Sequence, residues 1–353
     1  MDFMSFFTPE ALAANWTEVA SNRIPFLGEG LFPARKKAGL DLSWFKDNKG
    51  LPISLMPSAF DAQATYRDRI GVEKLETEMP FFREGFKIKE KDRQELLRAS
   101  EVSDRYAQAV INRVFDDNRQ LIQGALVVPE RMRMQLLFAV NGNVGITIKA
   151  NGVDYTYDYD PAVGGTRPWK STNYFALTGD AQWSNPATAD PFANVETAKQ
   201  AISDKTGTDL RYAIMNRYTF NQMVKCNVLK NRFMAKNGLA IAYLTPKELG
   251  NVFEDTTELG IVVYDKQFKN ESGVAAKFVP NGYVALIPDG VIGDTWFGTT
   301  PEEADGKNTT LVETGISITT VDIPHPVNKN ILASEIVLPS YERMDEVALL
   351  KVL

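Results

Sequence analysis

Residues 92–128 read DRQELLRASEVSDRYAQAVINRVFDDNRQLIQGALVV, and this stretch decides the fold. It contains no proline, and its only glycine, Gly124, lies near its end. Apolar residues recur at three- and four-residue steps, as one face of a helix requires: Val102, Tyr106, Ala109, Val110 and Val114. About 35 helical residues would extend roughly 50 Å, which is long for a globular domain. The sequence therefore predicts a long helix that other elements pack against.

Two features follow this helix. Pro129 is predicted to break or kink it, because proline lacks the N–H that a helix interior needs, and residues 130–137 are predicted to restart a shorter helix. Residues 144–149 and 153–158 then alternate like strands around Asn151-Gly152. Both residues of that pair tolerate positive φ, so this pattern predicts a β-hairpin closed by a type I′ turn.

The segment before the helix, residues 67–93, is dense in charges of both signs. Phe86-Lys87-Ile88-Lys89 alternates with the period of a strand, and a ribbon of two strands this polar has almost no core of its own. The alternative is a solvated charged loop. If it is a ribbon, it should gain order on a neighbouring surface and add almost nothing to the stability of its own subunit. The residues proposed for that contact are Arg67, Asp68, Arg69, Glu73, Lys74, Glu76, Phe81, Phe82, Phe86, Lys87 and Lys89.

The N-terminal region also suggests contacts beyond itself. Thr8-Pro9 predicts a helix start, with a capping hydroxyl and proline at the first helical position, and the helix should run to about Ser21. Residues 22–57 are rich in Pro and Gly and should be extended and irregular, yet they are apolar. An extended apolar arm needs a surface to lie on. Its candidate contact residues are Phe26, Leu31, Phe32, Trp44 and Phe45.

The rest of the chain mixes helices and strands, so the predicted class is α+β. Residues 160–191 are rich in Pro, Gly, Asn and Trp, which predicts long loops. Residues 192–300 alternate helical and strand patterns and predict a compact α/β unit. A polar insertion at 301–309 separates this unit from strands expected at 316–321 and 331–338.

Composition limits the function classes. The net charge of −6 argues against binding nucleic acid by clustered Lys and Arg, although a wall that encloses DNA without gripping it remains compatible. Cys226 is the only cysteine, so an internal disulfide is excluded and a reducing environment is expected. The first residues resemble no secretory signal, and no stretch approaches the apolar length that a membrane span needs.

A search for chemistry finds no catalytic, cofactor or metal site. The single histidine, His325, lies between two prolines and is expected in an extended connector, while Cys226 is expected to be a small buried side chain. Gly28-Glu29-Gly30 is only a fragment of a dinucleotide fingerprint. Asp158-Tyr159-Asp160 and the pair Asp255 and Glu258 could form paired carboxylates or a weak cation site, but surface acidity is the favoured interpretation.

A family resemblance emerges from the two ends of the chain and from the order of its elements. Residues 8–15, TPEALAAN, resemble the opening helix of the lambda-type major capsid proteins of tailed phages, the family called phage major capsid protein E. Residues 336–340, IVLPS, and 345–347, DEV, resemble that family's closing strand and its acidic–apolar tail. The arm, charged ribbon, long helix, α/β unit and returning strands follow the same order. The resemblance implies the HK97-like fold.

The resemblance also implies a domain map. Residues 1–52 would be the N-terminal arm, and 53–93 the extended loop that reaches over a neighbouring subunit. Residues 94–160 would hold the long helix and hairpin of a peripheral domain, 161–311 an axial domain, and 312–353 a return to the peripheral domain. The charged ribbon would then find its ionic partners and its missing core on the next subunit.

The implied function is that of a structural subunit and not of an enzyme. Pentamers and hexamers of the chain would form an icosahedral head around double-stranded DNA, assembled in the host bacterial cytoplasm. Because no scaffolding domain precedes Thr8, a separate scaffolding protein is expected beside a portal, and a decoration protein is left open. No cofactor or membrane is expected. Two alternatives remain, namely the shell protein of a non-viral nanocompartment with the same fold, and a hydrolase or lyase with an acidic site within 160–260.

Overall fold

The computed structural model describes residues 7–20, 24–46, 73–90, 94, 104–150, 152–237, 245–325 and 327–353. The chain forms two compact units, each built from three separate stretches of sequence. Unit 1 consists of Met1–Ser43, Glu76–Met132 and Gly293–Ser340. Unit 2 consists of Trp44–Leu75, Arg133–Ile292 and Tyr341–Leu353. Neither unit could fold from a single continuous segment.

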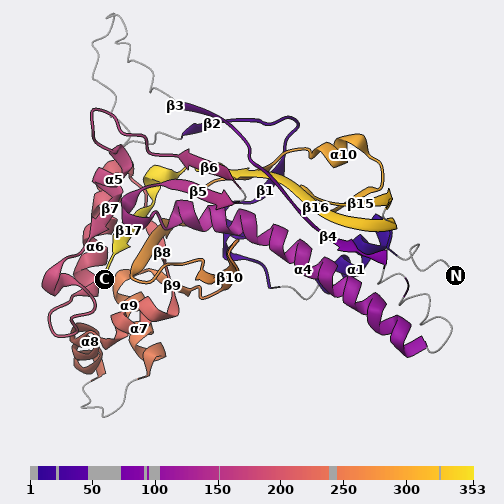
Figure 1. The fold of residues 1–353 in the computed structure, drawn as a ribbon. Helices are drawn as coiled ribbons and strands as arrows, with labels where there is room; N and C mark the ends of the chain where they lie inside the picture. The colour runs from indigo at the N-terminus through magenta and orange to yellow at the C-terminus, as the bar shows by residue number, and fades with distance from the viewer. Residues whose placement is uncertain are drawn as a thin grey trace, which may run out of the picture. The chain divides into compact units, whose positions relative to one another are not determined.

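The long helix predicted from the sequence is α4 (Asp104–Leu137), which is the longest helix in Figure 1. The part of the prediction from Asp92 to Ser103 lies outside the described helix. The predicted break at Pro129 is wrong, because the helix continues through this residue. Proline fixes φ near −65°, a helical value, and costs mainly one backbone hydrogen bond and a local clash. Burial of Pro129 and of the neighbouring Glu130 and Met132 accompanies the continuous path.

The sheet of unit 1 is organised around one long strand, β16 (Val327–Pro339). β16 pairs antiparallel with β15 (Ile316–Pro324), with β4 (Phe81–Ile88) and, at its C-terminal end, with β13 (Thr295–Phe297). β14 (Thr309–Glu313) continues the sheet beyond β15, and β1 (Ala34–Lys36) adds in parallel to β13. The predicted strands at 316–321 and 331–338 are confirmed within β15 and β16.

Helix α1 (Pro9–Ala20) contributes to the core of unit 1. Its predicted start is confirmed, since the Ala11 N–H donates to the Thr8 hydroxyl oxygen at 3.3 Å. The indole N–H of Trp16 donates to the Glu313 carboxylate in β14 at 3.0 Å. Side chains from α1, α4 and the sheet share one buried cluster: Phe7, Leu12, Trp16, Ile88, Val114, Ile122, Leu126, Ile316, Ile318, Ile331 and Ala333. The apolar stripe of α4 is therefore buried as the sequence pattern requires.

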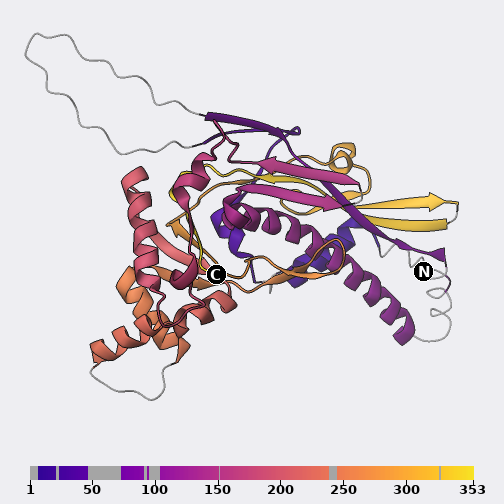
Figure 2. The ribbon, with the colours of Figure 1, turned by 60° about the vertical axis from the view of Figure 1, so that its left-hand side comes forward.

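Unit 2 contains a five-stranded mixed sheet in the order β7-β17-β12-β8-β9. Its strands are β7 (Tyr174–Ala176), β17 (Ala348–Lys351), β12 (Tyr283–Pro288), β8 (Leu210–Met215) and β9 (Gly260–Val263). Four helices accompany it: α6 (Pro191–Thr206), α7 (Arg217–Lys225), α8 (Asn227–Asn237) and α9 (Pro246–Thr257). Figure 2 shows these helices gathered beside the sheet. The α/β unit predicted for this region is confirmed in its element types.

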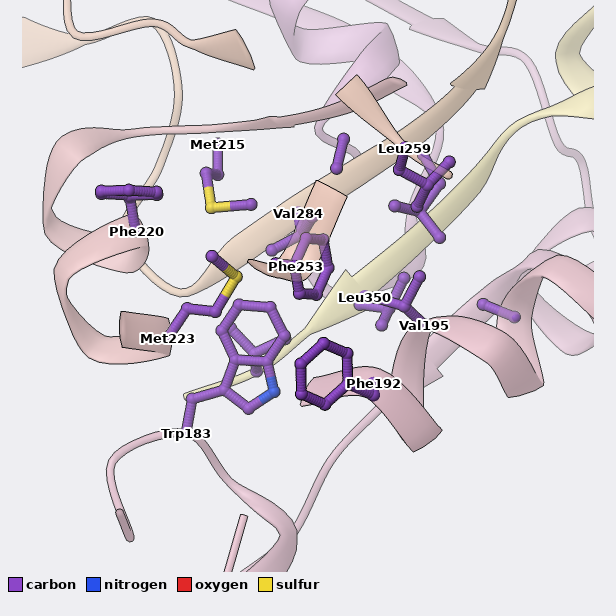
Figure 3. Close-up of a cluster of buried hydrophobic side chains, with 14 of the residues drawn as sticks. Trp183, Phe192, Val195, Met215, Phe220, Met223, Phe253, Leu259, Val284 and Leu350 are labelled. Atoms are coloured by element: carbon purple, nitrogen blue, oxygen red, sulfur yellow. The ribbon is translucent and has the colours of Figure 1, made fainter. Parts of the chain in front are cut away.

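Buried side chains from the helices and the sheet form the core of unit 2 (Figure 3). Trp183 and Phe192 lie beside Phe253 and Met223, and the stacked rings of Phe192 and Phe253 have centroids 5.7 Å apart. The strand side chains Val284 and Leu350 come from opposite halves of the sequence of this unit. The C-terminal strand β17 therefore completes a core that begins more than a hundred residues earlier.

The predicted hairpin is confirmed as β5 (Gly145–Ala150) and β6 (Val153–Asp158), which pair antiparallel residue for residue. Asn151 lies outside the described residues, and Gly152 has φ +79°, a value that a turn of this type requires and that glycine adopts without strain. A second hairpin joins β10 (Gln267–Lys269) to β11 (Ala275–Lys277).

Two regions contain more regular structure than the sequence predicts. The arm, predicted to be irregular, contains the short helix α2 (Leu27–Leu31) and the strands β1 and β2 (Asp41–Lys46). Between 160 and 191 lie α5 (Pro168–Asn173) and β7, and Trp169 and Trp183 are fully buried. Tertiary packing of the tryptophans orders a segment whose local composition is typical of loops.

Gly85 in β4 gives a test of the pairing with β16. A Cβ atom there would lie 2.4 Å from Leu332 Cδ2 and 2.5 Å from the Ile331 carbonyl oxygen. Gly85→Val should therefore lower the free energy of unfolding by about 1–3 kcal/mol through overpacking. Urea unfolding of the unassembled subunit measures the change.

Gly124→Ala is the matched control, because a Cβ atom at Gly124 in α4 meets nothing within 4 Å. It should raise stability by about 0.5–1 kcal/mol, the usual gain when alanine replaces glycine in a helix. Equal destabilisation by both substitutions would contradict the described β4–β16 packing.

Candidate assembly surface

The charged segment before α4 is divided between two sheets. β3 (Glu73–Glu78) pairs with β2, whereas β4 pairs with β16. The predicted ribbon, in which the two strands of this segment form a sheet of their own, is therefore wrong. Of the candidate contact residues, Arg67, Asp68 and Arg69 lie outside the described residues. The backbones of Glu73, Lys74 and Glu76 belong to β3, and the remaining candidates lie in β4 or just after it.

β4 is an integral strand of unit 1. It pairs with β16 over eight residues, from Phe81 opposite Ile336 to Ile88 opposite Lys329. Ile88 is buried, Phe86 packs against the unit 1 core, and the Arg83 guanidinium lies 4.7 Å from the centroid of the Phe81 ring. The expectation that residues 67–93 add almost nothing to their own subunit is therefore wrong for 81–88. The sequence could not reveal this, because its pairing partner lies some 250 residues away.

The exposed side of β4 still offers groups to a neighbour. Lys87 and Lys89 are exposed, while Phe81 and Phe82 are half-buried. A strand that is fixed on one subunit and displays lysines beside aromatic rings can contribute to an interface rim, where charges steer docking and fix its register. Contact of these residues with another subunit stays a prediction.

A small acidic helix holds β4 and the arm. Helix α10 (Pro301–Asp305) begins at Thr300, whose hydroxyl oxygen accepts the N–H of Glu303 at 3.2 Å. Glu302 pairs with Arg83 of β4, and Glu303 pairs with Lys36 of β1. Neighbouring ion pairs of this kind share the entropic cost of ordering their side chains, so α10 connects three segments that are far apart in sequence.

The arm is attached by further contacts within unit 1. Arg35 pairs with Asp294 at 2.7 Å, directly beside the β1–β13 ladder. The Glu130 carboxylate in α4 is fully buried and accepts the N–H of Gly28, in the first turn of α2, at 3.2 Å. A carboxylate at a helix N-terminus is favourably placed for the helix dipole. The arm is thus tied to α4 as well as to the sheet.

The candidate arm residues differ in their burial. Phe32 is fully buried in unit 1, and Phe26 packs against the unit 1 core. In unit 2 Trp44 is buried, and its ring centroid lies 5.4 Å from that of Tyr159. Leu31 is half-buried, and the side chain of Phe45 lies outside the described residues. The apolar character of Phe32 and Trp44 is therefore explained within the chain, and an intersubunit role for the arm residues remains a prediction.

The groups that could carry chemistry occupy structural positions. Cys226 is fully buried between α7 and α8, and burial raises the pKa of its thiol to about 11, so the thiolate is scarce at neutral pH. His325 is exposed at the tip of the β15–β16 hairpin, where Pro324 pairs with Val327. The predicted extended connector at His325 is corrected to this hairpin tip, because the two flanking strands pair directly.

The acidic run at 158–160 is not simple surface acidity. The Asp160 carboxylate is buried and accepts the N–H groups of Trp169 and Lys170 at the start of α5, at 2.9 and 3.1 Å. Burial alone would raise the pKa of Asp158, but hydrogen bonds from Arg167 outweigh it and lower this pKa. Among the described residues, no group of three His, Cys, Asp or Glu side chains is placed to hold a metal ion. No described helix is long and apolar enough to cross a membrane.

The family follows from the sequence match. Residues 8–352 match the family described as phage major capsid protein E. The chain belongs to this family. Its function is therefore that of a phage major capsid protein, a structural subunit of the virion shell. No relative was found among proteins with curated descriptions.

Solved structures agree with this family at the level of the fold. A phage-related protein from Bordetella bronchiseptica RB50 is 16% identical, with a TM-score of 0.54 over 98% of this chain and 97% of that one. A prophage protein of E. coli CFT073, described as a candidate capsid protein, is 12% identical, with a TM-score of 0.59 over 98% and 99%. The capsid of cyanophage A-1(L) gives 13% identity and a TM-score of 0.50 over 93% and 92%. The capsid protein E chain thus has the HK97-like fold predicted from its sequence.

Sequence reasoning missed α10, which was interpreted only as part of a polar insertion. The signal was present as Thr300-Pro301-Glu302-Glu303, since a hydroxyl residue three positions before Glu, with proline between them, is typical of a helix start. The partners of its acids could not be found in this way, because Lys36 and Arg83 lie far away in sequence.

Replacing the two groups that most often carry chemistry tests their structural assignment in this capsid protein. Cys226→Ser and His325→Gln should each change the free energy of unfolding by no more than about 1–2 kcal/mol and leave assembly intact. Urea unfolding and negative-stain microscopy provide the measurements. Loss of a measurable catalytic activity in either variant, with folding unchanged, would instead support an enzyme.

Proposed function

We propose that this capsid protein assembles into the pentamers and hexamers of an icosahedral head that encloses double-stranded DNA. The observation that carries the proposal is the family match over residues 8–352, which is supported by the fold. Closed shells of one chain need heterologous contacts that repeat around fivefold and sixfold centres. A net charge of −6 fits a wall that encloses DNA without binding it tightly.

The proposed domain roles follow the family map. Residues 1–52 act as the arm, 53–93 as the extended loop that reaches a neighbour, 94–160 and 312–353 as the peripheral domain, and 161–311 as the axial domain. The structure adds a physical constraint to this proposal. Because β4 is fixed to β16, the part of the extended loop that is available to a neighbour is expected before β3 and on the exposed side of β4.

The proposed partners are other copies of the chain, a separate scaffolding protein and a portal, with a decoration protein left open. Assembly is proposed to take place in the host bacterial cytoplasm. Catalysis is not part of the proposed role, since the Cys226 thiol is buried and the one histidine is exposed on a hairpin tip. The nanocompartment alternative is less favoured, because the family match is to phage capsid proteins.

The assembly state of the purified protein tests this function. Pentamers, hexamers or shells should predominate over monomers on sizing and in negative-stain images, with or without a co-expressed scaffolding protein. The physical reason is that a shell subunit leaves surfaces on both sides that only further copies cover. A monomer that persists at tens of micromolar in every salt and with every scaffold would refute the proposal.

The extended loop can be tested without disturbing the sheets. Replacing residues 55–70 with a short Gly-Ser linker leaves β2, β3 and β4 in place. The subunit should stay folded, because a change of loop length costs little entropy, but normal shells should not form. Circular dichroism and negative-stain microscopy measure the two properties. Normal shells from this variant would show that the loop is not an intersubunit clamp.

A further inference from the structure

Unit 2 contains an open groove between α7, α9 and β9. Its volume is about 480 Å³. The apolar side chains of Phe220, Ile261 and Val263 line it, beside Gly250, where the absence of a side chain leaves the Phe220 ring accessible. Charged side chains also line the groove: Arg217, Lys247 and Glu254. An apolar centre with a charged rim is the usual composition of a protein interface.

One wall of the groove is the edge of a sheet. β9 is the last strand in the order β7-β17-β12-β8-β9, and among the described residues no strand pairs with its outer side. The N–H of Tyr264 donates to the Met215 carbonyl of β8, so alternate residues Ile261 and Val263 direct their backbone groups away from β8. The Ile261 N–H is already bound by Glu254 at 2.7 Å. The outward carbonyl of Ile261 and N–H of Val263 can therefore extend the ladder.

A segment with matching chemistry lies in the same part of the sequence. Residues 238–244, between α8 and α9, read GLAIAYL and carry no charge. Large and small side chains alternate, with Leu239, Ile241 and Tyr243 at odd positions and alanines between them. Alternation with a period of two places the three large apolar side chains on one face of an extended strand. Such a face needs an apolar surface to cover it.

We propose that residues 238–244 of a second copy of this chain add as a strand to the outer edge of β9. Leu239, Ile241 and Tyr243 would then lie in the groove, and the alanines would face outward. Strand addition of this kind draws affinity from backbone hydrogen bonds and specificity from pockets for alternate side chains. This inference rests on the proposed function, because it names one contact between capsid subunits.

A second copy is favoured as the occupant because of the numbers on each side. Every subunit carries one groove and one segment, so copies arranged head to tail satisfy each other one for one. A heterologous contact of this type closes into a ring when its rotation is suitable, as pentamers and hexamers require. The uncharged segment also suits the apolar centre of the groove, leaving Arg217 and Lys247 at the rim.

Directed cross-linking tests the pairing in the assembled protein. In a Cys226→Ser background, subunits carrying Ala242→Cys are co-assembled with subunits carrying Lys247→Cys and treated with a short bismaleimide. A covalent dimer is expected on a denaturing gel from the mixture, and much less from either variant alone. The matched control replaces Lys247→Cys with Lys225→Cys, an exposed lysine at the other end of α7 that does not line the groove, and should give little dimer.

The variant with both Ala242→Cys and Lys247→Cys identifies the occupant. A ladder of cross-linked oligomers is expected if the segment lies in a neighbour's groove. A cross-linked monomer of altered mobility, without a ladder, would show that the segment fills its own groove and would overturn the proposal. Equal dimer yields from Lys247→Cys and Lys225→Cys would also overturn it.

A pair of neighbouring substitutions gives an independent test. Ile241→Asp puts a charge on the docking face and should reduce the yield of shells at least tenfold, whereas Ala242→Asp on the opposite face should reduce it much less. Equal yields from the two variants would refute the assigned face. Wild-type shells with no cross-link would reject this contact alone, whereas a wild-type protein that forms no shell would reject the proposed function itself.

Discussion

The pairing of β16 with strands from three other parts of the chain is the interaction on which unit 1 depends. β16 receives β15 from its own hairpin, β4 from the charged segment and β13 from the stretch just before α10. Because β13 in turn pairs with β1, the arm also depends on this strand. A strand paired on both sides along most of its length is held more firmly than an edge strand. The segments that it anchors can therefore extend from the subunit without unfolding it.

Ionic contacts refine this arrangement and contribute less stability. The pairs of α10 with Arg83 and Lys36, and of Asp294 with Arg35, involve partly exposed side chains. Such pairs usually contribute well under about 1 kcal/mol each, so the β ladders must supply most of the attachment. The ion pairs instead fix where the arm and β4 lie relative to α10. For a protein that must present the same surface in every copy, this positional role matters more than stability.

The capsid function is expressed in surfaces, and the described residues show how the chain prepares them. Buried side chains such as Phe32 and Trp44 stabilise the subunit itself, although their segments look like free arms in the sequence. The exposed lysines of β4 and the open edge of β9 are left for other copies. A subunit of this kind combines rigid units with unsatisfied edges, and closed assembly is the state in which those edges are covered.

The sequence by itself determined the elements whose signals are local. The long apolar period of α4, the Asn-Gly turn of the β5–β6 hairpin and the Thr8-Pro9 start of α1 each arise within a few helical or strand turns. The family resemblance at the two ends added the HK97-like fold. Tertiary structure alone decided the partner of β4, the continuation of α4 through Pro129, and the acids that hold Lys36 and Arg83. These depend on contacts between residues far apart in sequence, whose cost and gain no local pattern records.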